Sequence, residues 1–487
     1  MMRSFVTAGL IVSLLLLPPG GRRAAAGAGR DAPAAELERL IRRLMDEGDV
    51  PGLSVALIRG AKVYWHRAFG LKNAETREPL DDATVFEAAS LGKPVIAYAV
   101  LKLADAGGLD LDKPLSSYLP APYLQGDERV KLITARMVLS HRTGFQNEVT
   151  PGNPLKLYFT PGERFSYSGE GFVYLQKVVE EVTGERLDAF TKRTVFDPLG
   201  MADSSYVWRD GYERSKASGH DAAGAVGRMR RPTVASPSSL HTTVLDFAKF
   251  VVAVMNGTGL RKETAREMLR TQARVEEGCH TCVGRGAGRL SETLSWGLGW
   301  GLERTKAGGA FWHWGENNGE FQNFVMAYPG MNTGVVIFTN SGNGISVMPE
   351  IVSRALGGGP HPAFAWMGYE AYDSPARLLL RDILRRGDAA VRQYREARGK
   401  SPRALSEARL NQLAYTLLAR KRVAEAVELF RLNVEDFPDS WNACDSLGEA
   451  YMVRGDKELA IKYYRRSLEL NPANANAAEM IKKLSGH

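Results

Sequence analysis

The sequence has few cysteines, and they form no recognisable metal or haem motif. Only three occur among 487 residues, Cys279 and Cys282 in the stretch GCHTC and Cys444 far along the chain. A metal centre would need more ligands than Cys279, His280 and Cys282 supply, and haem attachment requires a histidine directly after the second cysteine. We therefore expect no metal and no cofactor. The cysteines are expected to be structural, with the close pair able to form a local disulfide in an oxidising compartment.

Concentrated charge and long apolar runs are also missing. The formal net charge of +8 is spread along the chain, without the basic stripe interleaved with aromatics that marks a nucleic-acid surface. Beyond the N-terminal region, no apolar run is long enough to suggest a membrane span. Nucleic acid and the membrane interior are therefore not expected as partners. With 44% hydrophobic and 24% charged residues, the composition is that of a globular protein with room for two or three domains.

The N-terminus has the pattern of an export signal. Arg3 precedes the mostly apolar residues 5–17, which are followed by two prolines and a small-residue stretch at 24–29. A charged start, a short apolar centre and a small-residue exit are typical of a secretory signal peptide. No cysteine follows the apolar centre, so lipid attachment is not expected there. We predict a signal peptide over residues 1–26 and a periplasmic or secreted mature protein without a membrane span.

Three common site motifs are absent, namely G-x-S-x-G, H-E-x-x-H and G-x-x-x-x-G-K-[ST]. What the sequence does contain is a single S-x-x-K, formed by Ser90 and Lys93 at the start of an amphipathic segment. A separation of three positions on a helix places both side chains on one face. There, a lysine that its surroundings keep neutral can accept the proton of the serine hydroxyl. The same spacing also describes a serine at a helix start followed by a surface lysine. Pro94 disfavours helical geometry at Lys93, so we expect an irregular or 3₁₀ first turn.

Residues 31–358 mix strands, helices and glycine-rich turns. The stretches GLSVALIRG and AKVYWHRAFG predict a hairpin with its turn at Gly60, and FQNFVMAYPGMNTGVVIFTN predicts two more strands around the turn at Pro329. Strands at both ends with helices between them predict an α+β fold, in which distant parts of the chain form one antiparallel sheet with a helical insertion. Residues 359–375, which are rich in glycine and proline at their start, are predicted to be a linker.

The last part of the chain has a helical pattern that repeats. Ala426 and Phe430 recur 34 residues later as Ala460 and Tyr464, each time followed by a proline. This period and these residue types resemble the tetratricopeptide helix pair. We predict an all-α tetratricopeptide-like domain over residues 376–487, with two clear repeats and a degenerate earlier one. Such repeats either dock a protein partner or pack on the preceding domain without a further role.

Eight stretches, in order along residues 35–345, resemble the serine β-lactamase and penicillin-binding-protein-like hydrolases, in particular the class C-like branch that includes D-peptidases and esterases. They are VPGLSVALIRG, TVFEAASLGKPV, AGGLDLDKPLSSYLP, ITARMVLSHRTGF, FTPGERFSYSGEGF, LHTTVLDFAKF, WGLGWG and FWHWGENNGEF. The resemblance implies a β-lactamase/transpeptidase-like antiparallel sheet with a helical subdomain. It also implies an acyl-enzyme on Ser90 and a small-molecule or peptide substrate.

The resemblance assigns roles to further residues. Tyr167 in FSYSGEGF stands at the second motif of the family, where a tyrosine shares the general acid and base work. His313 and Gly315 in HWG stand at the third motif, and the backbone N–H of Glu316 would complete an oxyanion site with that of Ser90. Without the resemblance, such a tyrosine is more often a packed aromatic and such a histidine a buried core residue. Two asparagines that follow the third motif receive no role.

Two departures from the family pattern bear on the substrate. Gly169 stands where the lactamase branch carries an asparagine that binds a substrate amide, and Trp314 replaces a threonine or serine that helps to bind a substrate carboxylate. Both count against β-lactamase or D-alanyl carboxypeptidase activity. The sequence therefore favours an exported serine hydrolase acting through an acyl-enzyme on an ester or amide. The alternative from another class is a non-catalytic binding protein on the same fold, with the repeats as its docking surface.

Overall fold

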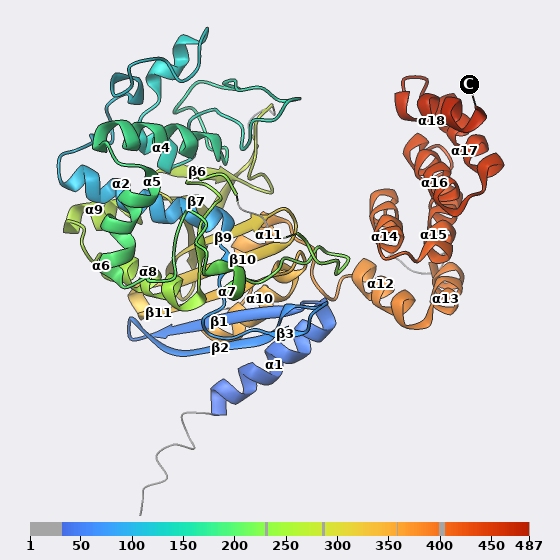
Figure 1. Ribbon diagram of the computed structural model, residues 1–487, viewed down its shortest axis with the longest axis horizontal. Helices are drawn as coiled ribbons and strands as arrows, with labels where there is room; N and C mark the ends of the chain where they lie inside the picture. Colours follow the sequence, from blue (N-terminus) through green and yellow to red (C-terminus); the bar gives the residue numbers. More distant parts are fainter. Residues whose placement is uncertain (1–31, 229–231, 285–287, 358, 399–404, 487) are drawn as a thin grey trace, which may run out of the picture.

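The computed structural model describes residues 32–228, 232–284, 288–357, 359–398 and 405–486. The predicted signal peptide, residues 1–26, lies outside these ranges. Within them, no helix combines the length and the apolar character needed to cross a membrane. A body of sheet and helices comes first along the chain, and a stack of helices stands to one side of it (Figure 1).

A nine-stranded antiparallel sheet, counted over the described residues, forms the centre of the first body (Figure 1). Its order is β3-β2-β1-β11-β10-β9-β8-β7-β6. The strands are β1 (Gly52–Arg59), β2 (Lys62–Asn73), β3 (Glu78–Pro79), β6 (Ala273–Glu276), β7 (Leu290–Trp296), β8 (Gly301–Thr305), β9 (Gly308–Asn317), β10 (Phe321–Tyr328) and β11 (Thr333–Thr339). The first strand pairs with the last, with Val55 opposite Ile337. The prediction of one antiparallel sheet assembled from distant parts of the chain is therefore confirmed.

The first hairpin shows how the local sequence sets the register of this sheet. Arg59 pairs with Lys62, which leaves a turn of two residues between the strands. Gly60 and Ala61 both have positive φ, 58° and 52°, as the type I′ turn of a two-residue hairpin requires. The predicted turn at Gly60 is confirmed. Ala61 adopts a conformation that glycine or asparagine would reach at lower cost.

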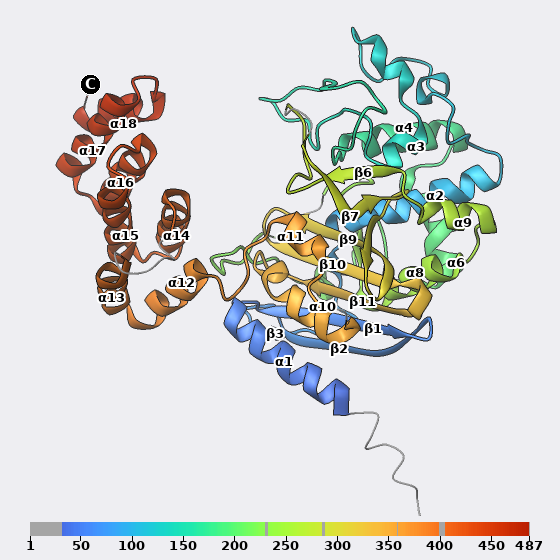
Figure 2. The ribbon, with the colours of Figure 1, turned by 180° about the vertical axis from the view of Figure 1, so that it is seen from behind.

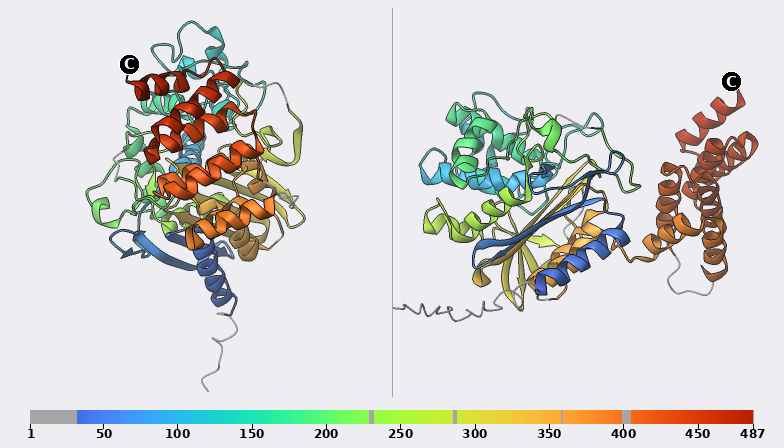
Figure 3. Two further views of the ribbon diagram at one scale, coloured as in Figure 1. Left: turned by 90° about the vertical axis from the view of Figure 1, so that its right-hand side faces the viewer. Right: turned by 60° about the horizontal axis from the view of Figure 1, so that its bottom comes forward.

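Helices cover both faces of the sheet. On one face lie α1 (Ala32–Gly48), α10 (Met348–Leu356) and α11 (Pro362–Met367), with their own apolar core (Figure 2). On the other face lie α2 (Gly92–Asp105) and α8 (Val244–Asn256), which share a larger core with the helical subdomain. The right-hand view of Figure 3 shows the two layers on opposite sides of the sheet.

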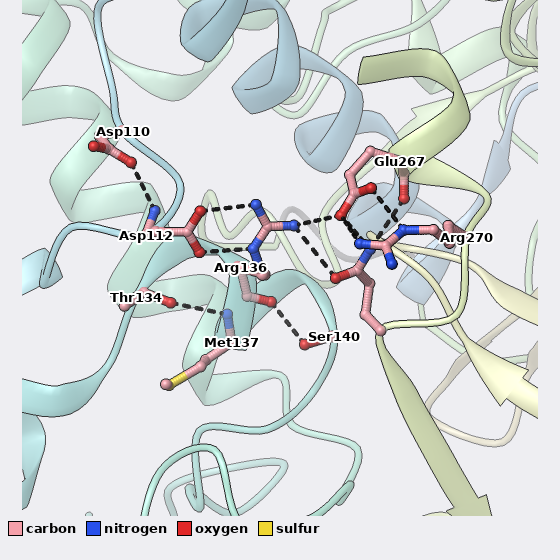
Figure 4. Close-up of polar contacts among 9 residues, drawn as sticks. Asp110, Asp112, Thr134, Arg136, Met137, Ser140, Glu267 and Arg270 are labelled. Carbon is pink, nitrogen blue, oxygen red and sulfur yellow. Dashed lines mark hydrogen bonds and ion pairs between the residues drawn. The ribbon is translucent and has the colours of Figure 1, made fainter. Parts of the chain in front are cut away.

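The helical subdomain is tied together by ion pairs centred on Arg136. Its helices are α3 (Ala135–Leu139), α4 (Glu170–Thr183), α5 (Leu187–Thr191), α6 (Asp197–Leu199), α7 (Tyr212–Ser215) and α9 (Lys262–Met268). The Arg136 guanidinium lies 2.7 Å from an Asp112 oxygen and 2.9 Å from a Glu267 oxygen, and Glu267 also binds Arg270 (Figure 4). One side chain of α3 thus holds both a loop and the end of α9.

Residues 359–375, predicted to be a linker, pack on the sheet. The ring of Phe364 lies 4.4 Å from that of Phe324 on β10, and Trp366 is only 5% exposed. The buried His361 ring lies 2.9 Å from a Glu303 carboxylate oxygen on β8. The stretch HPAFAWMG explains this packing. Burial of its large apolar side chains stabilises the fold, whereas an extended linker would leave them exposed to water. This segment therefore belongs to the core of the first body.

The C-terminal residues form paired helices, as predicted. They are α12 (Pro375–Arg386), α13 (Asp388–Arg398), α14 (Glu407–Ala419), α15 (Val423–Asp436), α16 (Trp441–Arg454), α17 (Lys457–Leu470) and α18 (Ala475–Ser485). The recurring residues are buried at equivalent places, with Ala426 and Phe430 on α15 and Ala460 and Tyr464 on α17. They belong to a core separate from those of the sheet. The predicted helical repeat region is confirmed.

The repeat helices touch the first body through arginines. Arg381 of α12 donates a hydrogen bond of 3.2 Å to the carbonyl of Glu47, at the end of α1. Arg420 donates one of 3.2 Å to the carbonyl of Ala222 and lies 3.7 Å from the Asp49 carboxylate. From this junction the later helices extend away from the sheet (Figures 1 and 2).

Candidate active site

Ser90 lies in a single 3₁₀ turn, Ala89–Leu91, that leads directly into α2. The irregular first turn expected from Pro94 is therefore confirmed. Ala89 has a φ of 54°, in the left-handed region that residues with a Cβ seldom adopt. The surrounding structure holds this strain, because the two-stranded sheet of β4 (Phe86–Glu87) and β5 (His241–Thr242) lies directly before the turn. Strain of this kind is concentrated at functional sites.

Lys93 is buried and lies next to Ser90. Its Nζ atom donates a hydrogen bond of 2.9 Å to Ser90 Oγ and one of 3.2 Å to the carbonyl of Pro237. The residue is only 2% exposed, which excludes the surface lysine that spacing alone allowed. Burial lowers the pKa of Lys93 to about 7, against a weaker opposing effect of Glu148. A large fraction of the amine is therefore neutral at neutral pH and able to accept a proton.

Tyr167 completes a group of three in which Lys93 and Tyr167 are buried and Ser90 is partly exposed. Its ring centroid lies 4.8 Å from Lys93 Nζ, and its hydroxyl makes no hydrogen bond of good geometry to any described residue. Burial raises the pKa of the Tyr167 hydroxyl, with a smaller opposing effect of the Ser90 hydroxyl. The phenol is therefore protonated at neutral pH.

The backbone around Tyr167 is held by two other segments. The N–H groups of Ser166 and Ser168 donate to the carbonyl and to the ring Nδ1 of His141, at 2.8 and 3.0 Å. Between them, the N–H of Tyr167 donates to the carbonyl of His280 at 2.7 Å. Three consecutive amides are thus satisfied by residues that lie far away in the sequence.

His280 lies in a loop closed by a disulfide between Cys279 and Cys282, a bond that the close spacing of this pair allowed. The N–H of Cys282 donates to the Ser166 hydroxyl at 2.9 Å, and the His280 ring lies 6.1 Å from that of Trp314. The cysteines, which were expected to be structural, therefore border the segment that carries the tyrosine.

His313 lies on β9 where this strand has no partner on one side among the described residues. β8 pairs with β9 only as far as Trp312, which leaves 313–317 with an open edge toward the site. The His313 ring donates from Nδ1 to the carbonyl of Trp314 at 2.7 Å. Burial, and then the charge of Lys93, lower the pKa of His313 to about 3. The ring is therefore neutral and adds no second cation beside Lys93.

Gly315 is needed by the protein's own backbone. A Cβ atom at this position would lie 2.2 Å from the carbonyl oxygen of Ala88, in the segment that leads to Ser90. The next side chain, Glu316, accepts a hydrogen bond from the hydroxyl of Tyr369, which follows α11. Trp314 is 7% exposed and packs in the core shared with α1, α10 and α11, which we call the second core. Its bulky side chain therefore lies among other aromatic rings.

Gly169 lies against an asparagine that the sequence interpretation missed. A Cβ atom at Gly169 would lie 2.7 Å from the carbonyl oxygen of Asn147. The Asn147 side chain also accepts a hydrogen bond of 2.9 Å from the Gly169 N–H. An amide side chain is therefore present next to the position where it was thought to be missing. In the sequence, the signal for this side chain was the polar pair Gln146 and Asn147, which directly follows the stretch HRTGF. His141 is the first residue of that stretch.

Of the two asparagines left without a role, Asn317 acts as a bridge. Its Nδ2 donates to a Glu87 carboxylate oxygen at 3.0 Å and to the carbonyl of Ser238 at 3.1 Å. Glu87 also forms a buried ion pair of 2.8 Å with Lys216. These contacts hold the loop that contains Pro237, whose carbonyl accepts a hydrogen bond from Lys93. Asn317 therefore supports the position of Lys93 indirectly.

Two family models match the chain. One described as beta-lactamase matches residues 37–352, and one described as tetratricopeptide repeat matches residues 441–474. A solved structure of a class C beta-lactamase has a TM-score of 0.58 and 18% identity, over 68% of this chain and 99% of that one. This likeness shows a shared fold.

Curated relatives match over part of their length. "Protein flp" of Staphylococcus aureus (strain N315) is 22% identical over 343 residues, which is 66% of this chain and 65% of that protein. "Esterase EstB" of Burkholderia gladioli is 30% identical over 227 residues, which is 40% of this chain and 57% of that protein. The chain thus spans less than two thirds of the length of either relative.

Proposed function

The chain belongs to the beta-lactamase family, and from that premise we propose that it is an exported serine hydrolase that forms an acyl-enzyme on Ser90. One observation carries the proposal: the partly exposed Ser90 meets the buried side chains of Lys93 and Tyr167, with 2.9 Å between the amine and the serine hydroxyl. A non-catalytic binding protein would have no need for a buried lysine at this place, since burying an amine is costly.

In the proposed reaction, neutral Lys93 accepts the proton of Ser90 as the serine oxygen attacks the substrate carbonyl. The N–H groups of Ser90 and Glu316 stabilise the negative charge on the carbonyl oxygen. Tyr167 donates a proton to the departing alcohol or amine, and the proton held by Lys93 restores the phenol. Lys93 and Tyr167 then take a proton from a water molecule as it attacks the acyl group. The bond to Ser90 Oγ breaks, the proton passes to this oxygen, and the acid leaves.

The two buried histidines support this scheme by staying neutral. Burial lowers the pKa of His141 well below its usual range and that of His313 to about 3. Neither adds a positive charge that would compete with the protonation of Lys93 during turnover. Lys93, with a pKa of about 7, is thus the group near Ser90 whose charge changes close to neutral pH.

We favour an ester as the substrate, because an activated leaving group needs little help from side chains that bind an acyl amide. The name of the Burkholderia relative supports this choice. One observation favours a second candidate, hydrolysis of small amides, D-alanyl peptides or β-lactams. The Asn147 side chain lies beside Gly169, which supports a role for its amide in binding an acyl amide.

Export and a docking role for the repeats belong to the same proposal. The leader pattern and the disulfide between Cys279 and Cys282 both support an oxidising compartment, such as the periplasm or the cell exterior. The tetratricopeptide match supports a protein partner for the C-terminal helices.

Covalent labelling with a fluorophosphonate probe tests the nucleophile. We expect labelling of the wild type, with the probe mass on the peptide that contains Ser90, and none of Ser90→Ala. Replacing the exposed Ser117 by alanine is a matched control that should leave labelling unchanged. Labelling that persists in Ser90→Ala would refute the assignment, and an unlabelled, inactive wild type would favour the non-catalytic alternative.

A further inference from the structure

His141 contacts residues 166–168 through its backbone carbonyl, its ring nitrogen and its ring face. It is completely buried and has a φ of 54°, a strained value for a residue with a Cβ. Its carbonyl and its ring Nδ1 accept the hydrogen bonds from Ser166 and Ser168. Because these two amides flank Tyr167 on either side, they fix the backbone from which the phenol projects.

The imidazole also lies flat against the phenol. The ring centroids of His141 and Tyr167 are 4.2 Å apart, with an angle of 27° between the planes. Phe165, Phe172 and Trp296 surround the imidazole at 5.1 to 5.8 Å. The imidazole is therefore held firmly, and it restricts rotation of the Tyr167 ring on the face that it covers.

The hydrogen bonds also determine the tautomer. Nδ1 accepts from the Ser168 N–H, so the proton of the neutral ring resides on Nε2, which has no partner among the described residues. Burial first, then Lys93 and His313, keep the pKa of His141 low. A protonated ring would lose its bond to Ser168, so the neutral form is the one that holds Tyr167 in place.

We propose that His141 is a positioning residue that holds the Tyr167 hydroxyl against Ser90 and Lys93. This role rests on the proposed function, since it concerns the residue that donates a proton in that reaction. His141 contacts no reacting atom, and it acts through Tyr167. Displacement of a catalytic group by about 1 Å costs on the order of a hundredfold in rate, so the contribution is measurable.

Two substitutions separate the parts of this role. His141→Asn retains a side-chain acceptor and tolerates positive φ, whereas His141→Phe retains the flat ring without an acceptor. On a p-nitrophenyl ester, we expect His141→Phe to lower kcat by roughly tenfold or more with little change in KM, and His141→Asn to lower it less. Phe247→Leu, at a buried aromatic of α8 that packs against Phe250 and Phe338, controls for general loss of core stability.

The decisive measurement combines each substitution with Tyr167→Phe. If His141 acts through the tyrosine hydroxyl, its effect on kcat should largely disappear when that hydroxyl is absent, while Phe247→Leu should have the same effect in both backgrounds. An equal loss from His141→Phe in both backgrounds, or wild-type kcat in that variant, would overturn the proposal. If the phenylalanine variant does not fold, His141→Asn carries the same comparison.

Failure of this proposal differs visibly from failure of the proposed function. If Ser90 is not the nucleophile, the wild type is not labelled by the fluorophosphonate probe. If only the role of His141 is wrong, the wild type is labelled and active, and the kcat losses are independent of Tyr167.

Discussion

The Nζ atom of Lys93 lies 2.9 Å from the Oγ atom of Ser90, inside a core where the lysine is only 2% exposed. In the protonated state the amine donates to the serine. In the neutral state the direction reverses, and the hydroxyl donates to the amine nitrogen. The balance between these states determines when the serine can act as a nucleophile.

The pH dependence of activity should therefore follow Lys93. Since the amine must be neutral and its pKa is about 7, kcat/KM for a p-nitrophenyl ester should rise with pH with an apparent pKa near 7. The buried histidines should contribute no step in this range, because the pKa of each is lowered. Initial rates measured in overlapping buffers test this, and activity that falls or stays flat from about pH 6 to 8 would contradict it.

Stability should also rise with pH, but over a higher pH window than activity. Burial lowers the pKa of folded Lys93 to about 7, whereas the unfolded lysine keeps a pKa of about 10.4. Between these values the unfolded chain binds more protons, so the free energy of unfolding should rise with pH across this window. Lys93→Met should remove this rise and be more stable than the wild type at pH 6.

Urea unfolding of both proteins on either side of the window measures this difference. The matched control is Lys62→Met, at an exposed lysine on β2, which should follow the wild type. A wild-type slope that survives in Lys93→Met would show that other groups produce it.

Truncation should reveal where the hydrolase body ends. A chain that stops at residue 374 keeps α11 and Tyr369, whereas one that stops at residue 360 loses Phe364 and Trp366 from the second core. Removal of such buried aromatics costs on the order of 3–5 kcal/mol each. We expect the longer chain to be soluble and active on a small ester and the shorter one to misfold. Equal thermal stability and activity of the two would contradict this.

Substitution at Gly169 should not create a β-lactamase. An added side chain would collide with the Asn147 backbone, so Gly169→Asn should lower stability and ester turnover alike. Asn147→Ala should instead lower turnover of an amide or nitrocefin more than that of an ester, by roughly ten- to a hundredfold for one lost hydrogen bond. Parallel kcat/KM values for both substrates measure this, and an equal loss on both would remove Asn147 from amide recognition.

The parts of this structure that follow from local sequence were predictable. Ser90 and Lys93 meet because three residues span one helical turn, and the first hairpin forms because Gly60 allows a two-residue turn between alternating strands. In both cases the interacting residues are close in the chain. Patterns of spacing therefore contain enough information to pair them.

The contacts that depend on tertiary packing were not predictable in this way. Asn147 meets Gly169, and Pro237 meets Lys93, only after the helical subdomain has folded. The close approach of Gly315 to the carbonyl of Ala88 likewise joins segments that lie far apart in the sequence. Helix α11 has six residues, too few for a helical period to emerge from the sequence.

The aromatic cluster of the second core has an optical consequence. Four of the eight tryptophans, Trp296, Trp312, Trp314 and Trp366, have ring centroids 5.7 to 6.4 Å from one another, while Trp441 is alone on the repeats and 41% exposed. Emission near the tryptophan maximum, and the near-ultraviolet dichroism of coupled indoles, therefore report mainly on the sheet body. Far-ultraviolet dichroism instead reports on the helices of both the sheet body and the repeats, so of the two signals it is the one that also follows the repeats.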